Sequence, residues 1–248
     1  MSVLQTDILI VFLIILTVVA FLYASVGHGG ASGYLALMAL FSFPIIIMKP
    51  TALLLNIFVA GISFWFFRKN HHFKWKLFYP FAISSIPMAF LGGYISVNAT
   101  IYKQILGVFL VIAILRMLNI FGKPPTSLKD NNLIASLVIG AIIGLFSGMI
   151  GIGGGIILSP VIILLHWGTM KHAAAVSALF IFVNSISGII GFLAKGGSVP
   201  NEAFYFVPIA IIGGALGARY GSQKFNLKTL KYLLAGVLTI AAVKLFLI

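Results

Sequence analysis

The chain alternates between long apolar stretches and short polar connections. A run of about 18 or more apolar residues is long enough to cross a bilayer as a helix. The ten apolar segments are approximately 8–26, 29–47, 51–67, 77–96, 101–120, 133–150, 152–166, 172–194, 203–219 and 229–248. The seventh is short and contains Pro160. The pattern therefore predicts an all-α integral membrane protein with eight to ten transmembrane helices, some of them short or broken.

The two halves of the chain resemble each other. Residues 24–30 align with 148–154, Met48-Lys49 with Met170-Lys171, Pro87 and Gly92-Gly93 with Pro208 and Gly213-Gly214, and Lys103 and Arg116 with Lys231 and Lys244. Four matches in the same order indicate a duplication. Because each half has an odd number of segments, the second half enters the membrane from the opposite side, as in inverted-repeat transporters. We predict a first membrane repeat over 1–121, a cytoplasmic linker over 122–132 and a second repeat over 133–248.

Composition agrees with a membrane protein and limits its chemistry. The chain is 61% hydrophobic and 8% charged, has no cysteine and has a net charge of +13. In a soluble protein this charge would indicate nucleic acid, but here the basic residues lie between apolar segments. Of the 16 Lys and Arg residues, 12 lie in or near the odd-numbered connections, which the positive-inside rule places in the cytoplasm, with both termini outside. The expected partner is the lipid bilayer, and no nucleic acid is expected.

Two glycine-rich clusters occupy equivalent places in the two halves. They cover residues 25–33 and 147–155, and each joins two apolar segments with almost no polar linker. Such turns at membrane depth are tolerated only inside the protein or beside a watery cavity. Helix N-termini that begin there favour anions through their N–H groups and dipole. The alternative is that the glycines only let helices approach closely.

Polar residues inside the apolar segments add candidates for an anion site. The acidic residues Asp7, Asp130 and Glu202 all fall at a terminus or a connection, which argues against a cation carrier with an intramembrane carboxylate. A histidine in the first cluster can add positive charge, and amides or hydroxyls in the third segment of each half can donate hydrogen bonds. Hydrogen bonding between helices is the alternative role for these side chains. The candidate substrate-binding residues are Ser25, Gly27, His28, Gly29, Gly30, Ser32, Asn56, Gly151, Gly153, Gly154, Ser177 and Asn184.

Catalytic and metal-binding functions have little support in the sequence. No group of His, Asp and Glu has metal-ligand spacing, so we expect no metal and no cofactor. Ser25 and His28 lack the carboxylate partner of a nucleophilic triad, so we expect no enzyme.

The paired glycine motifs, the ten apolar segments and the chain length together resemble the TauE/SafE family of sulfite exporter-like permeases. The matching stretches are 25–33 and 148–160. The resemblance implies a bacterial cytoplasmic membrane protein that transports sulfite, organosulfonates or related anions. The sequence leaves open an anion channel on the same scaffold, a carboxylate transporter and assembly into a homo-oligomer.

Overall fold

The computed structural model describes residues 6–118, 127–223, 238–240 and 242–244, and every element in these ranges is a helix. The helices of residues 6–223 are α1 (Thr6–Ser25), α2 (Ala31–Leu40), α3 (Ile45–Lys69), α4 (Trp75–Tyr94), α5 (Ala99–Met117), α6 (Leu133–Ile150), α7 (Gly155–Leu164), α8 (Met170–Ala194) and α9 (Asn201–Gln223). Of these, α1, α3, α4, α6, α8 and α9 are long and apolar enough to cross a membrane. The predicted all-α membrane architecture is confirmed. Most of the tenth predicted segment and part of the predicted linker lie outside the described residues.

Helices α2 and α7 are too short to cross a bilayer. Each has 10 residues, which corresponds to a length of about 15 Å against a hydrocarbon core of about 30 Å. The prediction of a short seventh segment agrees with α7. The prediction of one continuous segment over 29–47 was wrong, because the chain turns at Ser42, which has a φ of 60°, and continues through extended Pro44 into α3.

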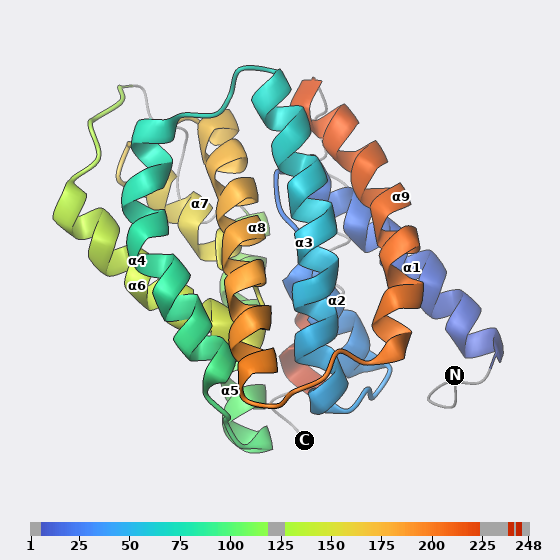
Figure 1. The fold of residues 1–248 in the computed structure, drawn as a ribbon. Coiled ribbons are helices and arrows are strands. Elements are labelled where there is room, and N and C mark those ends of the chain that lie inside the picture. Colours follow the sequence, from blue (N-terminus) through green and yellow to red (C-terminus); the bar gives the residue numbers. More distant parts are fainter. Residues whose placement is uncertain (1–5, 119–126, 224–237, 241, 245–248) are drawn as a thin grey trace.

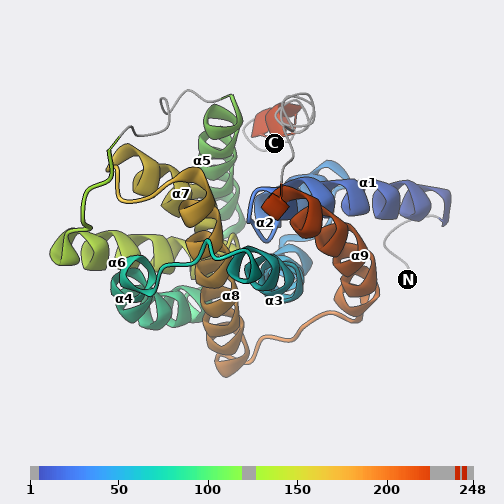
Figure 2. The ribbon, with the colours of Figure 1, turned by 90° about the horizontal axis from the view of Figure 1, so that it is seen from above.

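The helices form a central pair with a flanking pair on each side. Helices α3 and α8 lie next to each other in the middle, with α4 and α6 on one side and α1 and α9 on the other (Figure 1). The view from above shows the same order and places α5 and α7 along one edge (Figure 2). Both flanking pairs contact the central pair, α4 through α8 and α9 through α3. The arrangement leaves the two glycine-rich turns inside the protein.

Glycines let the flanking pairs approach until their backbones touch. A Cβ atom on Gly140, Gly144 or Gly148 of α6 would collide with the carbonyl oxygen of Phe81, Ser85 or Ala89 of α4, and one on Gly213, Gly217 or Gly221 of α9 would collide with that of Thr17, Phe21 or Ser25 of α1. Each set repeats every four residues, which places its members on one face of the helix. Lipid tails give no hydrophobic drive to helix association, so this close contact is a main source of stability.

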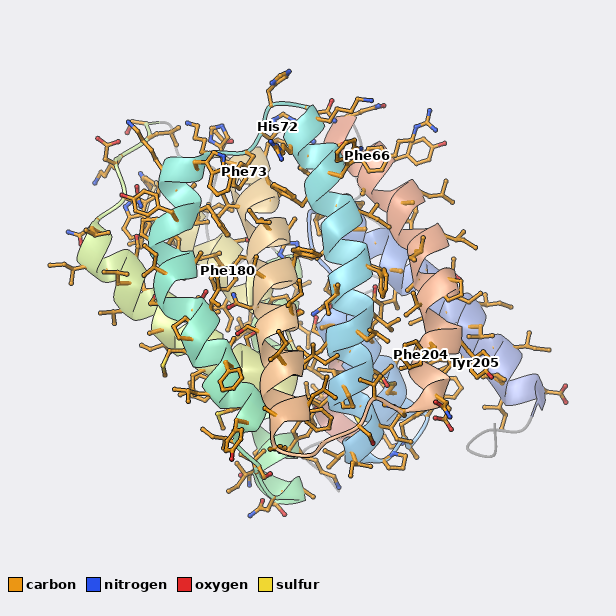
Figure 3. All side chains as sticks on the ribbon, viewed as in Figure 1. Phe66, His72, Phe73, Phe180, Phe204 and Tyr205 are labelled. Atoms are coloured by element: carbon orange, nitrogen blue, oxygen red, sulfur yellow. The ribbon has the colours of Figure 1, made fainter. Side chains whose placement is uncertain are left out.

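Basic connections gather at one end of the molecule. The α3–α4 connection lies there with His72, whereas Phe204 and Tyr205 at the start of α9 lie toward the other end (Figure 3). At the first end, the amide of Lys129 donates to the carbonyl of His166 at 2.8 Å, which ties the segment before α6 to the α7–α8 connection. The clustering of basic connections at one end agrees with the excess of Lys and Arg in the odd-numbered connections. The cytoplasmic position of that end remains a prediction.

We expect Asn132→Ala to lower stability by about 1 kcal/mol, because it removes an N-cap. The side chain of Asn132 caps α6 and accepts a hydrogen bond from the amide of Ala135 at 2.9 Å. Thermal unfolding of the purified protein in detergent measures the loss. Asn132→Asp keeps the acceptor and serves as the control; equal destabilisation by both variants would contradict this role of the cap.

Candidate anion-binding site

Both glycine-rich turns end one helix and begin the next with left-handed backbone. Left-handed φ values occur at Gly27, Gly30, Gly151, Gly153 and Gly154, at 77°, 101°, 91°, 76° and 79°. Only glycine adopts these angles without strain. The first turn joins α1 to α2 and the second joins α6 to α7, and both are buried. Residues far apart in the sequence thus form two similar corners inside the protein.

Asn56 of α3 bridges the two turns. Its side chain is 0% exposed, and its Oδ1 accepts a hydrogen bond from the amide of Ala31 at 3.1 Å. A Cβ on Gly29 would collide with this Oδ1, and a Cβ on Gly153 would lie 2.7 Å from Nδ2. The amide group therefore fits between Gly29 and Gly153 because neither residue has a side chain.

The other end of the Asn56 amide is a buried donor. Within the described part of the chain, Nδ2 is buried without a hydrogen bond, and the same holds for the hydroxyl of Ser185. Ser185 also lies against Gly153, with its Oγ 3.3 Å from the place of a Cβ there. Leaving a buried donor unpaired costs about 1–3 kcal/mol. An acceptor that reached Nδ2 would remove that cost.

Two helices begin at this region, and the first N–H group of one of them, that of Ala31, donates to Oδ1 of Asn56. Helix α2 begins at Ala31 and α7 at Gly155, each directly after its glycine turn. The first N–H groups of a helix have no intrahelical acceptor and carry the positive end of the helix dipole. Glycine at both N-caps, Gly30 and Gly154, supplies no side-chain cap. The arrangement is chemically suited to an anion.

His28 connects the first turn to α7 and α8. Its Nδ1 lies 2.9 Å from the carbonyl of Val26, and its Nε2 lies 3.1 Å from the carbonyl of Gly155 and 3.2 Å from the hydroxyl of Ser159. Ser159 in turn lies 2.7 Å from the hydroxyl of Ser177. Carbonyls only accept, so an imidazolium that donates from both nitrogens would satisfy both of them. The chain of contacts ties His28 to the N-terminal half of α8.

The remaining predicted residues lie around this centre with partners of their own. The hydroxyl of Ser25 donates to the carbonyl of Leu22 at 2.7 Å, and that of Ser32 donates to the hydroxyl of Tyr23 at 2.6 Å. Asn184 uses its Nδ2 to donate to the carbonyl of Phe180 at 2.9 Å, while its Oδ1 is buried without a partner in the described residues. Gly27 and Gly151 instead allow close contact with the backbones of α8 and α3.

Three buried residues near the turns were not among the predicted site residues. Ile181 would meet a Cβ on Gly29 or Gly153, and Ser185 adds its unpaired hydroxyl. Lys49 is 7% exposed and lies against Gly151. A lysine inside an apolar segment could have identified Lys49 as a candidate site residue. From the sequence alone, Lys49 was used only to align the two halves. Ile181 and Ser185 give no signal, since such residues are common in membrane helices.

Comparison with known proteins agrees with this architecture. The family model described as sulfite exporter TauE/SafE matches residues 11–245. A probable membrane transporter protein of Sinorhizobium fredii is 38% identical over 232 residues, which cover 92% of this chain and 94% of that protein. Probable membrane transporter proteins of Methanocaldococcus jannaschii and Bacillus subtilis are 29% and 26% identical over 71% and 79% of this chain, and cover 70% and 78% of those proteins. No solved structure matches. The fold, the whole-length family match and the relatives together show that the chain belongs to the sulfite exporter TauE/SafE family of membrane transporters.

Proposed function

We propose that the protein is a secondary transporter that moves a small sulfur-containing anion, sulfite or an organosulfonate, across the cytoplasmic membrane of its cell. The observation that carries the proposal is the amide of Asn56, which is buried between the N-termini of α2 and α7 and whose Nδ2 has no partner among the described residues. Donors without a negative counterpart favour an anion over a cation. The sulfur chemistry comes from the family description, and a carboxylate shares the same charge.

Reciprocal contacts support the inverted repeat. Helices α2 and α7 have equal lengths, as do α3 and α8. Gly27 lies against Ala174 of α8, and Gly151 lies against Lys49 of α3. Each turn thus packs against the fifth residue of the long central helix that belongs to the other half. Two similar halves around one central site are the usual basis of alternating access, in which one half moves against the other.

We expect a selective rise in melting temperature when the purified protein meets its anion. The panel contains sulfite, sulfate, thiosulfate, small sulfonates and carboxylates. A ligand that is present at 100 times its dissociation constant stabilises the folded protein by about 2.7 kcal/mol. The anion with the largest shift is then tested for counterflow in proteoliposomes. A carrier gives saturable exchange of labelled against unlabelled anion, whereas conductance without exchange would indicate a channel. A panel in which no anion or every anion stabilises would contradict a specific site.

A further inference from the structure

Two lysines share one aromatic ring at the end of the molecule away from the α3–α4 connection. The Nζ atoms of Lys49 and Lys195 lie 5.6 Å and 5.5 Å from the centroid of the Phe192 ring. Lys49 is buried near the start of α3, whereas Lys195 follows the last residue of α8 and is half-buried. We call Lys49, Lys195, Phe192 and Ser96 the lysine cluster. It links a lysine at the surface to one inside the protein.

The positive charge of the cluster is stabilised but not neutralised. The ammonium group of Lys49 donates to the carbonyls of Gly92 and Gly93 at 3.4 Å and 3.1 Å, and that of Lys195 donates to the hydroxyl of Ser96 at 2.6 Å. Carbonyls at the end of a helix carry only partial negative charge. Neither lysine forms an ion pair with an acidic residue in the described part of the chain, and the two charges repel each other. A buried charge without a counter-ion is costly, so an anion bound here would be stabilised.

The cluster lies next to the central site. A Cβ atom on Gly151 would be 3.0 Å from the carbonyl oxygen and 3.3 Å from the Cα of Lys49. Lys49 therefore contacts the second glycine turn through its backbone while its ammonium group extends toward the end of α4. Lys195 and Lys49 thus lie in order from the surface inward, and the backbone of Lys49 borders the second glycine turn.

The opposite end of the central pair shows that the fold does not require the second lysine. There Lys171 of α8 donates to the carbonyls of Gly221 and Ser222 at 2.6 Å and 3.2 Å, and lies 5.6 Å from the centroid of the Phe67 ring. The residue that follows α3 is the uncharged Asn70, which donates to the hydroxyl of Ser222 at 3.1 Å. The contact between the start of α8 and the end of α9 therefore forms with one lysine, whereas the corresponding contact between α3 and α4 has a second lysine beside it.

A neighbouring histidine does not add a second charge at that end. His72 contacts the Phe67 ring, with the ring centroids 6.3 Å apart. Burial lowers the pKa of His72, and the charge of Lys171 lowers it further, which favours the neutral imidazole. Among the described residues, two lysines over one ring are found at the Lys49 end and not at the Lys171 end.

We propose that Lys49 and Lys195 form an anion-binding station that captures the transported oxyanion before it reaches the glycine turns at Asn56. The inference rests on the proposed transport of an anion. A sulfonate, a sulfite and a lipid phosphate share the chemistry that two ammonium groups bind. We assign the station to the transported anion because Lys49 is buried, with 7% of its surface exposed, whereas a lipid headgroup stays at the membrane surface.

The test compares Lys195→Gln and Lys49→Met with the wild type in anion counterflow, using the anion that stabilises the protein most. The protein is reconstituted in one orientation, with Lys195 facing outside. The expected result is a KM for external anion raised about tenfold in each variant, with Vmax within about twofold, since such charges act on capture. Lys49→Arg is expected to restore most of the affinity. Lys129→Gln, at the opposite end, is the matched control and is expected to leave KM unchanged.

Other outcomes would overturn the station. An unchanged KM in Lys195→Gln contradicts it. A loss of Vmax at constant KM in Lys49→Met also contradicts it, because that result would show that Lys49 only holds α3 against α4. If Lys49→Met does not fold, Lys195→Gln alone decides the question. Repeating the assay with and without phosphatidylglycerol in the vesicles tests the lipid: if that lipid abolishes the difference between wild type and Lys195→Gln, a lipid phosphate occupies the cluster. Absence of any saturable counterflow in the wild type would instead refute the proposed transport.

Discussion

Asn56→Asp is expected to weaken binding of the stabilising anion by about 100-fold, which corresponds to about 2.7 kcal/mol. The substitution is nearly isosteric and keeps an oxygen that accepts from the amide of Ala31. It replaces the unpaired Nδ2 donor with an acceptor that is negatively charged when ionised. Losing a hydrogen bond to a charged ligand accounts for about 1.5–3 kcal/mol. Titration of the purified variant by thermal shift or calorimetry measures the change.

Asn98→Asp is the matched control for this experiment. Asn98 is exposed before α5, where its Oδ1 accepts from the amide of Ile101 at 2.8 Å. Aspartate is an equally good cap, so neither stability nor anion binding should change. Asn56→Ala removes the donor without adding charge and is expected to give an intermediate loss. Wild-type affinity in Asn56→Asp would show that the anion binds elsewhere.

Gly148→Leu is expected to prevent stable folding, at a cost of about 3 kcal/mol or more. A Cβ at this position of α6 would overlap the carbonyl oxygen of Ala89 and lie 2.7 Å from the amide nitrogen of Gly93, both in the backbone of α4. Neither atom can move without separating the two helices. The fraction of detergent-solubilised protein that elutes as a single species, together with its melting temperature, measures the effect.

Val138→Leu supplies the control on the same helix. Val138 is 54% exposed on the surface that faces lipid, so a larger apolar side chain there is expected to leave yield and melting temperature unchanged. If Gly148→Leu folds as well as Val138→Leu, the close contact of α4 and α6 is not needed for stability.

The lengths of the apolar runs were sufficient to predict most of the long helices. Segment 133–150 coincides with α6, and 172–194 differs from α8 by two residues at its start. The failure at 29–47 has a local cause: the stretch has no charged residue, so hydropathy averaged over the segment does not register the turn at Ser42 and Pro44. Segments buried inside a membrane protein need no polar residues to mark their ends. Their boundaries follow from backbone conformation, which single-residue hydropathy does not encode.

The candidate site was only partly accessible from the sequence. Asn56 and the glycine turns stand out as polar or flexible positions in apolar surroundings, and the structure places Asn56 between Gly29 and Gly153. The amide of Asn56 contacts both halves because of the way α3 packs. The spacing of residues along the chain does not determine this packing. The alignment of Lys49 with Lys171 identified two lysines with matching contacts. Their partners, the final carbonyls of α4 and α9, became visible only in three dimensions.

The position of a bound heavy-atom analogue tests the central claim most directly. Selenite replaces sulfite, and 2-bromoethanesulfonate replaces a sulfonate, according to which class stabilises the protein; anomalous diffraction then locates the selenium or bromine atom. The account predicts one main peak between the two glycine turns, beside Asn56 and the start of α7. A main peak on the outer surface, or bound analogue whose position is unchanged in Asn56→Asp, would contradict an anion site at these turns.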